Sequence, residues 1–158
     1  MAVVRRVLAT IRGRFLAFVV EAGGAVALAG LSRPWAWVGP EGPVVAGWEG
    51  YFRPATPVAL IVLLLGVVAT IRPGKPVFAC AATCAAILIV AGWLALLKPW
   101  AAAGMDGPCC MQLSVTPGDG VDVFLAGGII AGVAAGIGTV TRDRPNRRTT
   151  APVGPERP

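Results

Sequence analysis

The chain has 158 residues, of which 56% are hydrophobic and 14% are charged, and its formal net charge is +6. Too few charged residues are present for the surface of a soluble domain of this length, and the composition is typical of a protein whose solvent is the lipid bilayer. Histidine is absent, which removes the commonest general base and most zinc ligand sets. We therefore expect no enzyme activity, no cofactor and no metal site.

The N-terminal segment predicts a basic cytoplasmic arm followed by a first membrane span. Residues 1–14 contain four arginines and no acid, and residues 15–32 contain a single charge, Glu21. A cleaved signal peptide is the alternative, because the sequence ALA at 27–29 fits a cleavage site, but a glutamate within the apolar region counts against it. Three later spans are expected in either case.

Two longer connections, 33–54 and 98–121, are rich in proline, glycine and aromatic residues. Residues 35–38 and 44–46 are predicted to pair as a short hairpin over the helix ends, and 112–116 is a possible further strand. Aromatic rings favour the membrane–water boundary. Five tryptophans are predicted to lie there: Trp35, Trp37, Trp48, Trp93 and Trp100.

Three more spans are predicted at 55–71, 76–97 and 123–141, each close to the length needed to cross the hydrocarbon. A proline-containing turn at 72–76 separates the second span from the third. Residues 142–158 are rich in proline and arginine and lack apolar periodicity, so we expect a disordered cytoplasmic tail.

The basic residues predict the orientation of the chain. Eleven of the fourteen lysines and arginines belong to the N-terminus, the 72–76 turn and the tail. Because lysine and arginine are retained on the cytoplasmic side, both termini should be cytoplasmic and both longer connections outside. The predicted fold is an all-α membrane protein, a four-transmembrane-helix bundle in a plasma membrane, with a small aromatic extracytoplasmic cap. Its basic flanks favour anionic lipid over nucleic acid as a partner.

Gly128, Gly132 and Gly136 recur every four residues in the last span and fall on one helix face. Such a glycine ridge lets a neighbouring helix backbone approach closely. The neighbour could be another span of this chain. It could also be another subunit or a second copy, in which case the last helix is a docking face.

Glu21 is the one ionisable residue well inside a predicted span. A charge at mid-bilayer costs about 2.5–3.5 kcal/mol, so Glu21 should face protein. It is either a proton- or cation-responsive carboxyl or a neutral acid whose hydrogen bond locks two helices together.

Cys109 and Cys110 lie in the second outside connection, where thiols normally oxidise. They could form a disulfide with each other or with another chain. Because Met105 and Met111 bracket them, a soft-metal site is a further alternative. Cys80 and Cys84 are expected to be small apolar fillers in the third span.

Three segments resemble the Trp-biosynthesis-associated membrane protein family, one of the small four-span families of high-GC Gram-positive bacteria. They are AVALAGLSRPW at 25–35, GWE at 47–49, and the glycine-rich last span leading into RDRP at 142–145. The resemblance covers residues 15–145 and implies an integral membrane protein without catalytic residues.

These observations favour a non-enzymatic accessory or scaffold subunit of a membrane complex, with a partner or second copy bound through the last helix. The alternative is a small proton- or metal-linked transporter, or a redox-sensing membrane protein, that uses Glu21 and the Cys109/Cys110 pair.

Overall fold

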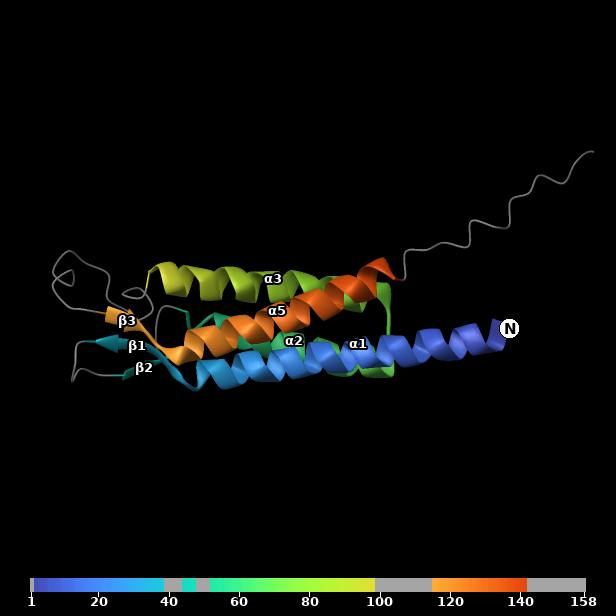
Figure 1. Cartoon of the computed structure of the whole chain (residues 1–158), viewed down its shortest axis with the longest axis horizontal. Helices are drawn as coiled ribbons and strands as arrows, with labels where there is room; N and C mark the ends of the chain where they lie inside the picture. The colour runs from blue at the N-terminus through green and yellow to red at the C-terminus, as the bar shows by residue number, and fades with distance from the viewer. Residues whose placement is uncertain (1, 39–43, 48–51, 99–114, 142–158) are drawn as a thin grey trace, which may run out of the picture.

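A computed structural model of the chain describes residues 2–38, 44–47, 52–98 and 115–141. These residues form four helices and three short strands (Figure 1). The helices are α1 (Ala2–Leu31), α2 (Ala55–Ile71), α3 (Lys75–Leu97) and α5 (Asp119–Val140), and the strands are β1 (Pro34–Val38), β2 (Val44–Ala46) and β3 (Val115–Pro117). The helices lie side by side along the long axis, and the strands lie together at one end (Figure 1). The mostly helical fold predicted from the sequence is confirmed.

Prolines set several of the helix ends. Arg72 and Lys98 each precede a proline, which disfavours helical backbone, and they leave the helix with φ, ψ of −130°, 81° and −133°, 68°. These two residues therefore end α2 and α3. The next helix starts after only two more residues at Lys75, with Pro76 in its first turn, where proline is tolerated.

Two helices begin earlier than the sequence predicted. α1 starts at Ala2 and runs without a break through the predicted basic arm into the first span, because residues 2–12 contain neither proline nor glycine. α5 starts at Asp119 after Gly118, not at residue 123. Asp119 and Asp122 lie in its first turn, where a carboxylate interacts favourably with the helix dipole. β3 covers 115–117, and residues 112–114 of the predicted strand lie outside the described residues.

The four helices form a closed ring in which α1 packs against α2, α2 against α3, α3 against α5 and α5 against α1. Three of them are long and apolar enough to cross a membrane: α3, α5 and the Thr10–Leu31 part of α1. α2 is a shorter apolar helix.

Small residues fill most of the interior of the ring, and large aliphatic residues cover its outside. No polar or charged residue among those described is buried. The buried small residues of α2, α3 and α5 include Ala59, Gly66, Ala69, Ala81, Ala85, Gly92, Ala95, Gly127, Ala131, Ala135 and Gly138. The exposed large residues of the same helices include Leu60, Ile61, Leu64, Val68, Ile71, Ile87, Val90, Leu94, Leu97, Ile129, Ile130, Val133, Ile137 and Val140.

The strands form one antiparallel sheet in the order β2-β1-β3. β1 pairs with β2 through Trp37 and Val44, with an irregularity between Pro34 and Ala36, and with β3 through Trp37 and Thr116. Because β1 follows α1 directly and β3 leads into α5, the sheet ties together the ends of the two helices that pack most extensively.

Trp35 joins this sheet to the helices. The side chain is 1% exposed, its Nε1 donates a hydrogen bond to the Gly30 carbonyl oxygen at 3.0 Å, and its ring meets Phe124 edge-on with centroids 5.0 Å apart. A Cβ at Gly47 would collide with the indole, so glycine at this position makes room for the ring. Trp35 is buried between the sheet and the helix ends, and its position at the membrane–water boundary stays a prediction.

We predict that Trp35→Phe lowers the thermal unfolding midpoint of the detergent-solubilised protein, followed by circular dichroism at 222 nm. The substitution removes one buried hydrogen bond and leaves a gap, at a cost of about 1–3 kcal/mol. Trp37→Phe on the same strand is the matched control, because Trp37 is 44% exposed and the change should be nearly neutral. Equal midpoints for the two variants would contradict the anchoring role of Trp35.

Candidate functional site

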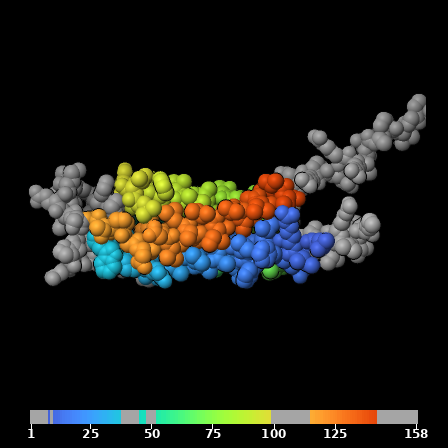
Figure 2. All heavy atoms as spheres, in the orientation of Figure 1, coloured from blue at the N-terminus to red at the C-terminus, as the bar shows by residue number. Residues whose placement is uncertain are grey.

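The closest approach between helices is the contact of α1 with α5, which lie against each other along their length (Figure 2). A Cβ on Gly23 would lie 2.7 Å from the Ala131 backbone nitrogen, and one on Gly127 would collide with the Ala27 backbone nitrogen. One on Gly30 would lie 2.5 Å from the Phe124 nitrogen. These atoms belong to backbone, which can move only if the helices separate. Glycine at 23, 30 and 127 is therefore required by the packing itself.

The sequence contains a signal for this contact that differs from the Gly128, Gly132 and Gly136 ridge. Small residues follow a four-then-three spacing on both helices, at 23, 27 and 30 on α1 and at 127, 131 and 134 on α5. This spacing keeps the small residues on one helix face. Gly128, Gly132 and Gly136, which recur at a regular interval, lie on the neighbouring face of α5.

The glycine ridge of Gly128, Gly132 and Gly136 makes looser contacts than predicted. A Cβ on Gly128 would meet Ile89 Cγ1 of α3 at 3.3 Å, and one on Gly132 would be 3.5 Å from the Cβ of Ala85, also on α3. A Cβ on Gly136 would find nothing within 4 Å. The first two glycines thus face α3 within the chain at roughly van der Waals distance, and Gly136 is only partly buried.

Glu21 lies where α1 approaches α2. A Cβ on Gly66 of α2 would be 2.6 Å from the Glu21 backbone nitrogen, so the glycine at 66 allows the two helices to touch at this point. The Glu21 side chain is half-buried. Gly66 lies five residues before the end of α2, which places the contact about 8 Å inside that end. The expected helix-locking hydrogen bond and the proton-responsive role both stay predictions.

The other predicted site residues are scattered. Trp37 and Trp93 are exposed, on β1 and near the end of α3. Cys80 is exposed and Cys84 half-buried on α3, and neither forms a disulfide. Four predicted positions lie outside the described residues: Trp48, Trp100, Cys109 and Cys110.

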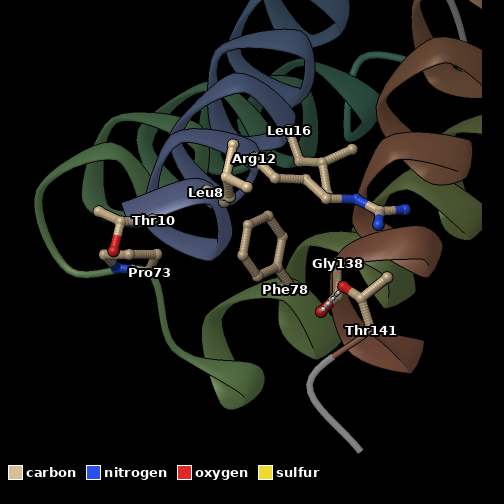
Figure 3. Close-up of a pocket in the computed structure, with 9 residues that line it drawn as sticks. Leu8, Thr10, Arg12, Leu16, Pro73, Phe78, Gly138 and Thr141 are labelled. Carbon is tan, nitrogen blue, oxygen red and sulfur yellow. Dashed lines mark hydrogen bonds between the residues drawn. The ribbon is translucent and has the colours of Figure 1, made fainter. Parts of the chain in front are cut away.

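The end of the bundle opposite the sheet contains a groove of about 540 Å³ (Figure 3). We call this end the basic end; it is formed by the first half of α1, the turn between α2 and α3, and the last turns of α5. The residues that line the groove are Leu8, Thr10, Arg12, Gly13, Leu16, Pro73, Phe78, Gly138 and Thr141. A Cβ on Gly138 would be 2.6 Å from the Phe78 ring, so Gly138 and Phe78 pack in direct contact.

Charges divide unequally between the two ends. The described cationic side chains of the basic end are all exposed: Arg12, Arg14, Arg72 and Lys75. No acidic residue lines the groove among those described. At the sheet end, by contrast, exposed Asp119 and Asp122 accompany the cations, and Asp119 Oδ2 pairs with Arg33 Nη1 at 3.4 Å.

Comparisons with protein-family models, with curated proteins and with solved structures found no match to this chain.

We predict opposite effects for the same substitution at two glycines of α5. Gly127→Ala should lower the thermal midpoint in mild detergent, because its Cβ collides with α1 backbone, and overpacking of this kind costs about 1–3 kcal/mol. Gly136→Ala should leave the midpoint unchanged or raise it, because the new methyl group meets nothing and alanine favours helix by up to about 1 kcal/mol. If the two variants lower the thermal midpoint equally, the assignment of the tight helix contact to Gly127 is wrong.

Proposed function

We propose that the chain is a four-span integral membrane protein of a bacterial plasma membrane, with both termini cytoplasmic and the sheet outside. The observation that carries this proposal is the distribution of residue sizes across the helices. Small residues face other helices, while long aliphatic side chains of α2, α3 and α5 face outward. Water would penalise such a surface heavily, whereas lipid tails solvate it, and helices in lipid gain chiefly from close packing of small residues.

Three threonines of the helices support the same environment, although the buried Thr56 hydroxyl of α2 has no hydrogen-bond partner among the described residues. Thr70, Thr83 and Thr139 each donate their hydroxyl proton to a carbonyl oxygen of their own helix, at 3.0, 3.1 and 2.7 Å. Hydrocarbon offers no water to polar groups, so each must find its partner within the protein.

α2 is the fourth span in this proposal although it is the shortest helix. Its seventeen residues reach about 26 Å, close to the thickness of the hydrocarbon layer. Arg53 and Arg72 flank it and are exposed, and long basic side chains can extend to the headgroups from either end. The short turn to α3 also requires α2 and α3 to run in opposite directions.

The orientation and the crossing of α2 can be tested together. In a variant in which all four cysteines are replaced by serine, we expect Arg53→Cys to react with a membrane-impermeant maleimide from outside intact spheroplasts. Arg72→Cys should react only after permeabilisation, because the positive-inside rule places the basic end in the cytoplasm. Labelling of both positions from the same side would contradict a crossing by α2.

Within the membrane we infer an accessory or scaffold role in a complex. We place the docking surface on the outward face of α5, where Ile129, Val133 and Ile137 are exposed and a bound partner would replace lipid. This surface replaces the glycine ridge as the proposed contact, since Gly128 and Gly132 face α3.

A pull-down of the tagged protein from its native membrane in mild detergent, with and without reductant, tests this role. We expect a membrane-protein partner in fixed stoichiometry. Val133→Trp should reduce its recovery about tenfold or more, by placing a bulky ring in the contact. Val90→Trp on α3 is the matched control, since Val90 and Val133 are 58% and 59% exposed. Loss of the partner in the presence of reductant would indicate that a disulfide from Cys109 or Cys110 links the two proteins.

Two results would contradict the accessory role. One is recovery of the chain alone or only with itself. The other is a transport activity that Glu21→Gln abolishes while the protein stays folded, because an accessory subunit should tolerate this neutral, nearly isosteric change.

A further inference from the structure

We propose that the groove at the basic end binds the headgroup phosphate and adjoining glycerol of an anionic phospholipid from the cytoplasmic leaflet. This inference rests on the proposed membrane location and deepens it by naming a ligand. The groove volume of about 540 Å³ lies in the range of small-molecule sites. It opens where the helices end, which in a spanning bundle is the level of the lipid headgroups.

The cation for the phosphate is Arg12. Its side chain is exposed and lines the groove, which Figure 3 shows extending toward the end of α5. A guanidinium offers a planar set of donors that matches phosphate oxygens in pairs. Thr141 is the other polar group on that wall, but its hydroxyl donates to the Ile137 carbonyl oxygen at 2.9 Å. The charged contact to the ligand therefore falls to Arg12.

The surroundings of Arg12 favour an anion over other occupants. Arg14, Arg72 and Lys75 are exposed at the same end, and no described lining residue is acidic. The carbonyl end of α5 carries a weak partial negative charge that opposes anion binding, and the Arg12 guanidinium, which extends toward that end, offsets it (Figure 3). The sequence that follows the lining residue Thr141, 142–158, contains five arginines and two acids, so like charge disfavours this tail as the occupant.

The rest of the lining suits the part of a lipid just below the phosphate. Leu8 of α1 is exposed and gives the groove an apolar wall, while the buried side chains of Leu16 and Phe78 lie beneath it (Figure 3). A site with one cationic contact and an apolar wall selects a molecule that has an anionic head joined to an apolar chain. Free phosphate would use only the first of these two features.

Native mass spectrometry of the full-length protein in a non-ionic detergent tests the proposal. The probes are phosphatidylglycerol and phosphatidylcholine with identical acyl chains. We expect preferential retention of phosphatidylglycerol, and Arg12→Gln should reduce that preference about fivefold, the effect of one basic residue near an anionic surface. Arg53→Gln, an exposed arginine next to α2 at the sheet end, should leave it unchanged. Leu8→Trp keeps every charge but fills the groove, and should also lower retention.

Several outcomes would overturn the lipid site. These are equal retention of the two lipids, equal losses in Arg12→Gln and Arg53→Gln, or full retention in Leu8→Trp. Displacement of phosphatidylglycerol by millimolar inorganic phosphate would also overturn it, by showing that only the phosphate of the ligand is recognised. A separate experiment measures whether the protein floats with membranes in a density gradient. If the protein floats but shows no lipid preference, only the lipid site is refuted. If it does not float, the proposed membrane location is refuted.

Discussion

The fold depends on how closely two helix backbones can approach. Side chains normally hold helices 8–10 Å apart, and the missing side chains of Gly23, Gly30 and Gly127 let α1 and α5 come closer along one face. In lipid this proximity is the main source of helix affinity, because apolar burial gains nothing when the surroundings are equally apolar. Gly24 and Gly66 allow the same close backbone approach between α1 and α2.

The close approach of the helix backbones also limits where functional groups can lie in the molecule. Close packing fills the interior, and no polar or charged residue among those described is buried, although the Thr56 hydroxyl and the Trp35 indole nitrogen are. Charged side chains therefore lie at the two ends, which differ. One end has a sheet anchored by Trp35 and charges of both signs, and the other has a groove lined by Arg12 with further cations exposed nearby.

The sequence was informative wherever one strong local signal decided the structure. Proline placement predicted the bounds of α2 without error and those of α3 to one residue, and the strand pair β1 and β2 was predicted from aromatic and β-branched residues. The contacts were not predictable in the same way. Both glycine faces of α5 have regular spacing, and only the rotation of the helix about its axis, which depends on all its neighbours, decides that Gly127 is buried more tightly than Gly128. The groove joins residues from three separate parts of the chain, so no local pattern could have indicated it.

The central position of β1 also imposes an order on biosynthesis. β1 and β2 flank the first connection, but β3 follows α3 in the chain, so one edge of β1 has no strand partner until residues 115–117 have been synthesised. An unpaired strand edge is open to pairing with other chains. The three-stranded sheet therefore closes only once the chain has been made as far as the start of α5.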